Sequence, residues 1–327
     1  MKPKIQDVAK LAGVSPTTVS RVLNDRGYIS DETREKVNKA MKELNYYPND
    51  VARSLYNKRT NLIGVILPTT SNPFFGELTF YIETICNSLG YKILLCNSLN
   101  NVDKEKNYLE MLMRNQVDGI IVGTHNQGIL DYKNNNLAVV SIDTDLDDNI
   151  PIIGSDNYNG GKIATELLIS KGCTNIINID GEFSLRTMAR LRKNAYEDIM
   201  KANNMVPITY EIKSAFDGED RIEIANKVLD EHPEVDGVFA TNDLFAASFI
   251  NEARRRGKRI PEDIKIVGYD GTETSRSLLP ELTTIKQPIE LIARKSIEIL
   301  IEEIEENYTN RSSKIALPVS LLEGKTT

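Results

Sequence analysis

Residues 4–24 constrain the chain most, because they form two short amphipathic segments separated by a glycine. Apolar residues of the first segment recur at helical spacing: Ile5, Val8, Ala9 and Ala12. Gly13 follows where a helix end favours a residue that tolerates positive φ. Ser15 can cap a second helix, and Pro16 suits its first position because no N–H is needed there. The pattern predicts two helices joined by a tight turn.

The second helix is expected from Pro16 to Leu23, with Val19, Val22 and Leu23 facing the first helix. Its outward residues are polar: Thr17, Thr18, Ser20 and Arg21. A helix-turn-helix uses this arrangement to bring its second helix against base edges in the major groove. The pattern by itself also fits two ordinary packed helices, because any amphipathic pair joined by glycine resembles it.

A third helix and the distribution of charge favour DNA binding. Ser30 can cap a helix whose first turn holds Asp31 and Glu32, and apolar spacing continues to Leu44. Residues 1–60 hold 12 Lys and Arg against 7 Asp and Glu, a formal charge of +5. The whole chain is −7, so residues 61–327 carry −12. A basic head on an acidic body is typical of a protein whose head alone meets phosphate.

The runs 5–24 and 46–55 resemble the head and hinge of LacI/GalR-family repressors, and the similarity extends through the body. Within that family, residues 123–126, 268–272 and 282–288 look most like sucrose-operon repressors of Gram-positive bacteria. The resemblance implies a homodimer on double-stranded operator DNA. The DNA-binding residues that it implies are Lys4, Ser15, Pro16, Thr17, Thr18, Arg21, Asn24, Ala52, Arg53 and Leu55.

Residues 49–56 are too short for a stable isolated helix, since fewer than about a dozen residues are marginal in water. In the family such segments pair across the dimer in the minor groove, and Leu55 matches the residue wedged between base pairs there. An apolar wedge unstacks a base step and bends the duplex. The alternative for Leu55 is an ordinary buried linker residue.

Beyond residue 60 the sequence alternates between β-branched apolar runs and amphipathic helical stretches, which indicates βαβ units and parallel sheets. The expected strands are 62–67, 91–96, 117–122, 138–142, 175–180, 208–212, 237–240, 264–268 and 282–286. The fold class expected is therefore a small all-α helix-turn-helix head followed by an α/β, periplasmic-binding-protein-like body with two parallel-sheet lobes.

Ligands of open α/β sheets bind outside the carboxyl ends of the strands, and polar or aromatic residues follow several of the expected strands. A sugar needs carboxylates and amides for its hydroxyls and an aromatic face for its C–H side. Taken singly, such Asp and Asn residues are more often turn or cap residues. Strand ends and the family resemblance together give the effector-binding candidates Phe74, Phe75, His125, Asn126, Asp143, Arg192, Asp243, Asp270 and Gln287.

Arg186 and Arg190 lie close to Arg192 in the sequence. The sequence therefore does not decide which of these three arginines matches the family's effector-binding arginine. Asp156 and Asn157 with Gly160 and Gly161 resemble the family's turn into the first helix of the second lobe and are interpreted as structural, with Gly161 allowing close packing. The excess of Asp over Lys and Arg favours a neutral ketose or disaccharide over a sugar phosphate, so the candidate effectors are sucrose, fructose and, less well matched, a sugar phosphate.

An enzyme is not expected. The chain has two histidines, no phosphate-cradling GxxxxGK, no nucleophile elbow and no metal-ligand spacing among Cys86, Cys96 and Cys173. No cofactor is predicted. Free cysteines without a signal peptide favour the cytoplasm, and no run of eighteen apolar residues suggests a membrane span.

The predicted domains are a head over 1–48, a hinge and linker over 49–60, an N-terminal lobe from 61–160 plus 290–319, and a C-terminal lobe from 161–289 plus 320–327. The function expected is sequence-specific repression of sugar-utilisation genes, most similar to sucrose genes, with release by a sugar bound between the lobes. The alternatives are a corepressor-dependent catabolite regulator of the same family and a sugar-binding protein without a DNA function.

Overall fold

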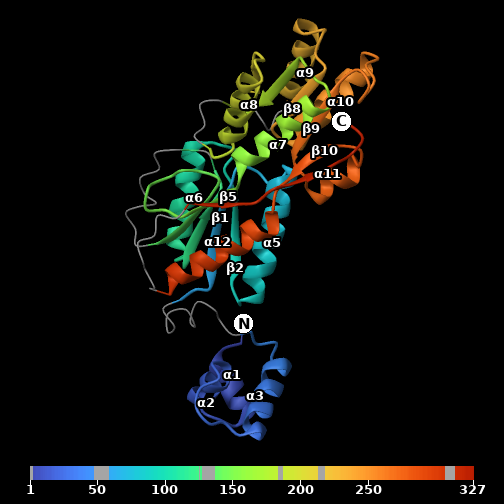
Figure 1. Ribbon diagram of the computed structural model, residues 1–327. Helices are drawn as coiled ribbons and strands as arrows, with labels where there is room; N and C mark the ends of the chain where they lie inside the picture. The colour runs from blue at the N-terminus through green and yellow to red at the C-terminus, as the bar shows by residue number, and fades with distance from the viewer. Residues whose placement is uncertain are drawn as a thin grey trace. The chain divides into compact units, whose positions relative to one another are not determined.

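The computed structural model describes residues 3–47, 59–124, 126, 137–182, 187–212, 218–305 and 314–327. The chain divides into two compact units, residues 1–60 and 61–327. Each unit has its own hydrophobic core, and Figure 1 shows the elements of both.

The head contains α1 (Ile5–Ala12), α2 (Pro16–Leu23) and α3 (Asp31–Glu43), as the sequence predicts. Its core is built from residues at the expected positions of the three helices, namely Val8, Ala9, Val19, Val22, Val37 and Ala40. Gly13 ends α1 with φ +68°, so the left-handed turn between the helices needs a residue without a side chain there. Ser15 caps α2 by accepting a hydrogen bond from the Thr18 amide at 3.1 Å.

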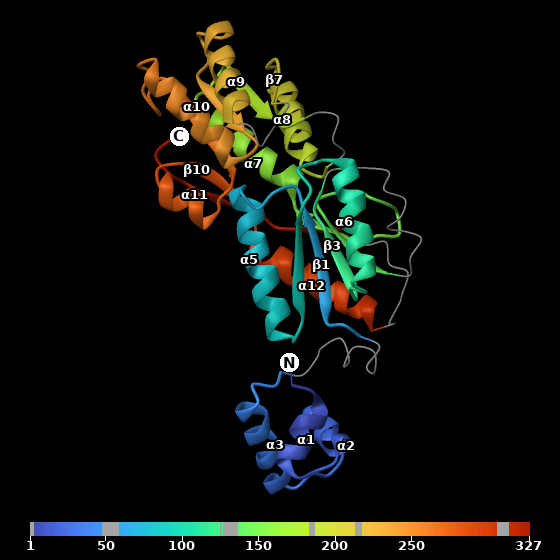
Figure 2. The same ribbon diagram turned by 180° about the vertical axis from the view of Figure 1, so that it is seen from behind.

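The first lobe of the body is a six-stranded sheet in the order β11-β5-β4-β3-β1-β2, with every paired strand parallel. Its strands are β1 (Leu62–Leu67), β2 (Lys92–Asn97), β3 (Gly119–Val122), β4 (Ala138–Ile142), β5 (Ile152–Ser155) and β11 (Lys314–Leu317). Helices α5 (Pro73–Ser88) and α12 (Ile289–Ile304) pack together over one face, and α6 (Val102–Arg114) covers the other (Figure 2).

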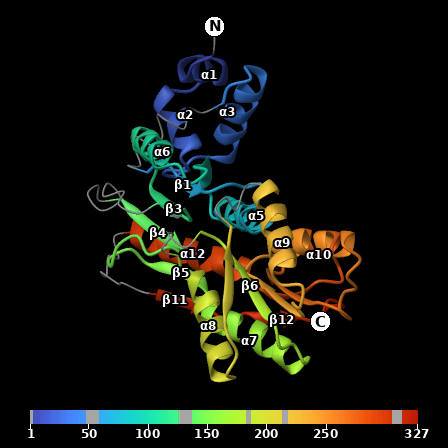
Figure 3. The same ribbon diagram turned by 90° about the horizontal axis from the view of Figure 1, so that it is seen from above.

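The second lobe is also six-stranded, in the order β12-β10-β9-β8-β6-β7. Its strands are β6 (Ile176–Asp180), β7 (Ile208–Glu211), β8 (Gly237–Ala240), β9 (Lys265–Asp270), β10 (Thr283–Lys286) and β12 (Ser320–Leu322). Helices α7 (Asn157–Ser170) and α8 (Arg190–Ala202) lie against each other on one face (Figure 3). Helices α9 (Gly218–Glu231) and α10 (Asp243–Arg255) cover the other face, and the short α11 (Glu273–Leu278) follows β9.

All the strands expected from the sequence are present, and their ends shift by at most a few residues. Three strands escaped prediction: β5, β11 and β12. The two predicted parallel sheets are confirmed, with one exception at the edge of the second sheet, where β12 pairs antiparallel with β10. These strands are short, and they pair with strands that are distant in sequence. The hydrophobic periodicity of the segments themselves therefore does not predict them.

Three segments connect the lobes, one between β5 and α7, one between β10 and α12, and one between β11 and β12. The predicted lobe boundaries near 160 and 289 fall close to the first two segments, and the boundary at 319 lies within the third. The predicted hinge at 49–56 lies outside the described residues.

Candidate functional site

The second helix of the head presents an exposed polar surface. Thr17 and Arg21 are exposed on α2, and Lys4 is exposed just before α1. Thr18 is half-buried, and its hydroxyl lies 2.9 Å from the Ser15 hydroxyl that caps the helix. The head therefore exposes a hydroxyl group at the start of α2 and a guanidinium in its last turn, as a major-groove helix needs.

Two other predicted DNA-binding residues of the head help to define α2 itself. Pro16 occupies its first position, and Asn24 ends it by donating from its side-chain amide to the Ser20 carbonyl at 2.8 Å. Ala52, Arg53 and Leu55 lie outside the described residues.

A cavity of about 320 Å³ lies within the body, between the carboxyl ends of the strands of the two lobes. Six predicted effector residues line it: Phe74, Phe75, Asp143, Arg192, Asp270 and Gln287. Phe74 and Phe75 begin α5 and pack edge to face, with ring centroids 5.2 Å apart. Pockets of roughly 300–1,000 Å³ with an apolar wall and a few convergent polar groups are typical of small-molecule sites.

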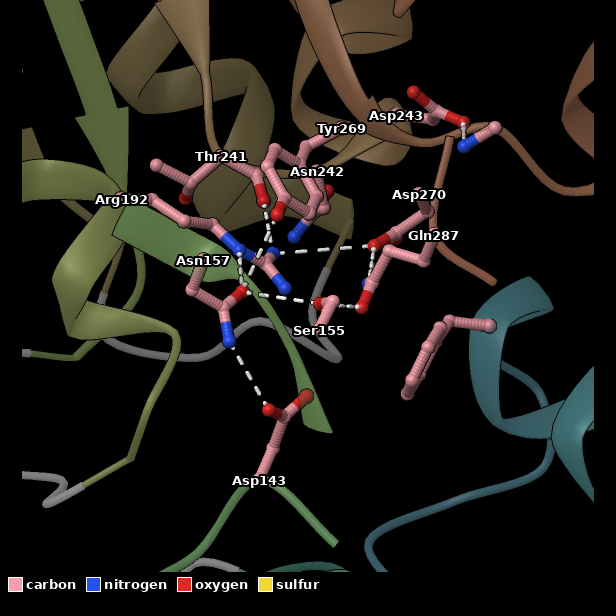
Figure 4. A network of polar contacts seen from close by, with 12 residues as sticks. Asp143, Ser155, Asn157, Arg192, Thr241, Asn242, Asp243, Tyr269, Asp270 and Gln287 are labelled. Atoms are coloured by element: carbon pink, nitrogen blue, oxygen red, sulfur yellow. Dashed lines mark hydrogen bonds and ion pairs between the residues drawn. The ribbon is translucent and has the colours of Figure 1, made fainter. Parts of the chain in front are cut away.

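Asp143 and Asp270 each follow or end a strand in a backbone conformation that is unusual for a residue with a side chain. Asp143 has φ +54° after β4, and Asp270 has φ +115° at the end of β9. Such geometry costs about 1–3 kcal/mol and persists where the surrounding structure enforces it, which happens most often at binding sites. Here it turns two carboxylates from different lobes toward the same cavity (Figure 4).

Arg192 lies on the first turn of α8 and is only 6 % exposed. Its Nε donates to Asn157 Oδ1 at 2.7 Å, and Nη1 donates to the Thr241 carbonyl at 2.7 Å. The guanidinium carbon stands 3.6 Å from the centre of the Tyr269 ring. A planar guanidinium held on two edges and one face is a fixed cation rather than a mobile one.

Carboxylates outnumber this buried cation. Arg192 Nη1 lies 3.9 Å from Asp270 Oδ1, while Asp143 and Asp180 also line the cavity. The pKa of Asp270 is raised to about 8, mainly by burial and also by the neighbouring carboxylates of Asp243 and Asp143, against the opposing effect of Arg192. Burial also raises the pKa values of Asp143 and Asp180. A neutral ligand rich in hydroxyl groups suits carboxylates that are desolvated in this way, because it supplies hydrogen-bond donors without adding charge.

Two predicted effector residues are buried but do not line the cavity. Asp243 accepts hydrogen bonds from the Thr284 hydroxyl at 2.6 Å and from the Gly271 amide at 2.9 Å, so its carboxylate ties α10 to β10 and to the turn after β9. Asn126 donates to Glu105 on α6 at 2.7 Å. Both follow strand ends, but hydrogen bonds to residues distant in sequence direct them into the protein. His125 lies outside the described residues.

Several residues of the site escaped prediction. Asp180 ends β6 and lines the cavity, and its place at a strand end could have identified it as readily as Asp270. Asn242, which follows β8 and is one of the polar residues expected after strands, also lines the cavity. Asn157 and Tyr269 hold Arg192 without lining the cavity. Both contacts join segments of the second lobe that are distant in sequence, so no local pattern indicates them. Arg190 also lines the cavity, but it is exposed, whereas Arg192 is buried and fixed.

No group of three or more His, Cys, Asp or Glu side chains in the described part of the chain could hold a metal ion. Among the same residues, no helix combines the length and the apolar character needed to cross a membrane. The three cysteines are buried, and burial raises their thiol pKa values to about 11 or 12, which keeps them protonated.

Comparison with known proteins identifies both parts of the chain. Residues 4–49 match the model for bacterial regulatory proteins of the lacI family, and residues 165–327 match the periplasmic binding protein-like domain. The chain is 45% identical over 326 residues to the sucrose operon repressor of Pediococcus pentosaceus, covering 100% of both proteins.

Two solved structures are also similar. The lac repressor dimer bound to operator and the anti-inducer ONPF superposes with a TM-score of 0.88 at 29% identity, covering 100% of this chain and 99% of that one. A periplasmic binding protein/LacI transcriptional regulator from Alkaliphilus metalliredigens, complexed with D-xylulofuranose, gives 0.76 at 34% identity, covering 82% and 99%.

Proposed function

Because the chain belongs to the lacI family of bacterial regulatory proteins and is similar over its whole length to transcriptional repressors, we propose that it represses sugar-utilisation genes and is released from DNA by a sugar. The repressor would bind a palindromic operator as a homodimer. The observation that carries the effector half of this proposal is the interlobe cavity, where one fixed guanidinium meets several buried carboxylates beside a pair of phenyl rings.

The proposed effector is a neutral sugar. Asp143, Asp180 and Asp270 can accept hydrogen bonds from hydroxyl groups, Arg192 and Gln287 can donate, and Phe74 or Phe75 can cover a C–H face. A phosphate would bring additional negative charge toward three carboxylates with one buried cation to oppose it.

A ketose unit is the best-supported class of sugar. One relative is named for the sucrose operon, and one similar structure holds D-xylulofuranose. Sucrose contains a ketofuranose ring, so both names point to the same kind of ring. Sucrose and fructose are therefore the proposed effectors, with sucrose 6-phosphate as the charged competitor to be tested.

On the DNA side, Thr17 and Arg21 are proposed to contact base edges, and Lys4, Ser15 and Arg53 to contact phosphates. Thr18 is proposed to lie on the same DNA-binding surface. Pro16 and Asn24 fix the ends of the recognition helix. The family role of the hinge segment, which includes Ala52, and of Leu55 as its wedge in the minor groove belongs to the same proposal. The four predicted domains are proposed with it.

Operator binding by the purified full-length protein tests the proposal. Fluorescence anisotropy with a labelled palindromic site is measured at fixed salt while sucrose, fructose and sucrose 6-phosphate are added separately, because affinity for DNA depends strongly on ionic strength. A sugar effector is expected to weaken operator binding about 5–150-fold. Failure of every sugar to change binding would contradict the effector proposal, and a sugar that tightens binding would favour the corepressor alternative.

Two matched cap variants separate DNA contact from folding of the head. Ser15 and Ser30 each accept a hydrogen bond from the backbone three residues ahead, so Ser15→Ala and Ser30→Ala should destabilise the head similarly, by about 1 kcal/mol. Only Ser15 stands at the recognition helix. Ser15→Ala should therefore weaken operator binding more than Ser30→Ala, and equal effects would contradict the proposed phosphate contact.

A further inference from the structure

Polar side chains lie at two of the segments that connect the lobes, and they are among the most deeply buried polar groups of the body. Ser155 ends β5, Asn157 begins α7, and Gln287 follows β10. All three are at most 3 % exposed. Buried polar groups need hydrogen-bond partners, and here the partners come from both lobes (Figure 4).

Asn157 uses both ends of its side-chain amide. Its Oδ1 accepts from Arg192 Nε at 2.7 Å, and its Nδ2 donates to Asp143 Oδ1 at 3.0 Å. Arg192 belongs to the C-terminal lobe and Asp143 follows a strand of the N-terminal lobe. The amide orientation follows from its partners, because a guanidinium can only donate and a carboxylate must accept.

A second chain of hydrogen bonds runs beside the first. Ser155 Oγ donates to Gln287 Oε1 at 2.5 Å, and Gln287 Nε2 donates to Asp270 Oδ1 at 2.7 Å. Ser155 ends a strand of the N-terminal lobe, and Asp270 ends a strand of the C-terminal lobe. The cavity residues of one lobe are thus bonded, through the connecting segments, to the other lobe.

We propose that Asn157 is a positioning residue that couples the proposed effector site to the arrangement of the lobes, by holding Arg192 with its carbonyl oxygen while its amide group holds Asp143 across the lobe junction. This inference rests on the proposed function for its biological meaning. Asn157 does not line the cavity, so it acts through two residues that do. A ligand that reorients Arg192 or Asp143 changes the geometry required of Asn157, and thereby the relation of the lobes.

Asn157→Asp is the sharpest test, because it keeps the acceptor toward Arg192 and removes the donor toward Asp143. The variant places two carboxylates opposite each other, and such a pair shares one proton with a raised pKa. The groups that face position 157 are Asp143, Arg192 and Tyr269, with Asp270 on the far side of Arg192. Asn159→Asp is the matched control, since residue 159 is exposed on the same helix.

Binding of fructose and sucrose to the full-length variants is measured by calorimetry between about pH 8 and about pH 5.5. At the upper pH, Asn157→Asp is expected to bind roughly 10-fold or more weakly than Asn159→Asp, because a hydrogen bond to a charged group is lost. The difference should shrink on acidification, since a shared proton restores a donor between the two carboxylates. Equal binding by the two variants, or a loss that does not depend on pH, would overturn the proposal.

A second measurement does not require the sugar. Spin labels on cysteines introduced at the exposed positions 87 and 223, on α5 and α9, report the distance between the lobes by double electron–electron resonance. In the Asn157→Asp variant, the distribution of distances between the two labels should shift or broaden at about pH 8. On acidification this distribution should return toward that of the parent protein. An unchanged distance would overturn the coupling role. If no sugar binds the parent protein, the proposed effector class fails, and this distance alone decides the role of Asn157.

Discussion

At the residue scale, Arg192 shows how much of the site depends on one fixed side chain. Its guanidinium simultaneously contacts Asn157, the Thr241 carbonyl and the face of Tyr269. A lysine ammonium cannot reproduce this planar set of contacts. Arg192→Lys is therefore expected to weaken sugar binding roughly 10–100-fold, corresponding to the loss of a hydrogen bond with a charged partner worth about 1.5–3 kcal/mol.

Calorimetric titration of the sugar checks this prediction, and Arg190→Lys is the matched control. Arg190 lines the same cavity but is exposed, so its replacement should change affinity only a few-fold. A larger loss for Arg190→Lys than for Arg192→Lys would transfer the proposed effector contact to Arg190.

Asp270 gives a prediction about pH. Burial raises its pKa in the folded protein to about 8, from an ordinary value of 3.8. The folded state therefore retains a proton that the unfolded chain releases, so stability decreases as pH rises from about 4 to about 8. Asp270→Asn removes this titration, and its Tm should fall less than that of the parent between about pH 5 and about pH 8.

Asp263→Asn is the control for that thermal unfolding series. Asp263 is paired with Arg259, which holds its pKa at about 2, so it does not titrate in the range measured. The control should follow the parent. An Asp270→Asn profile as steep as that of the parent would show that other groups cause the pH dependence.

At the element scale, the packing of α7 against α8 positions the site. A Cβ atom at Gly161 would lie 2.3 Å from the Arg192 carbonyl oxygen and 2.8 Å from the Arg192 Cα. Both are backbone atoms, so relief requires movement of the helix that carries the guanidinium. The interpretation of Gly161 as a close-packing residue is explained by this contact.

Gly161→Ala is expected to destabilise the body by about 1–3 kcal/mol through overpacking. The corresponding decrease in Tm is roughly 2–4 °C per kcal/mol, measured by calorimetry. Gly218→Ala in α9 is the control, because the nearest atom to its added Cβ is Arg221 Nη2 at 3.5 Å, an ordinary contact. Equal stability of the two variants would mean that α8 moves without cost and would remove the close-packing argument.

At the scale of the whole molecule, charge is divided between the two units. The head carries +5 and residues 61–327 carry −12. Operator affinity should therefore decrease steeply with salt, through release of counterions by the head. Lys4→Gln is expected to reduce the slope of log affinity against log salt by about 0.9 per subunit, since one phosphate contact is lost.

Anisotropy titrations over a salt series measure that slope, and Lys295→Gln on α12 is the control. Lys295 is half-buried in the acidic body, with 44% of its side chain exposed, and pairs with Glu298, so its loss should leave the slope unchanged. An unchanged slope for Lys4→Gln would remove Lys4 from the proposed phosphate contacts.

Features controlled by local chemistry could be predicted from the sequence. The head follows from helical spacing, a glycine with positive φ and side-chain caps, which act within a few residues of each other. The longer strands follow from β-branched runs, and the strand-end rule placed Asp143, Asp270 and Gln287 on the cavity. These patterns involve residues close together in the chain, so they can be recognised without the tertiary structure.

The tertiary structure decided which strand-end residues meet. Asp243 and Asn126 obey the same rule as Asp270, but their carboxylate and amide are turned inward by partners that the sequence does not show. Asn157 carries no signal of its own, and its role depends on Arg192 and Asp143, which stand 35 and 14 residues away. A hydrogen bond between residues distant in sequence requires the fold to bring two side chains to within about 3 Å, and a one-dimensional pattern contains no such distance.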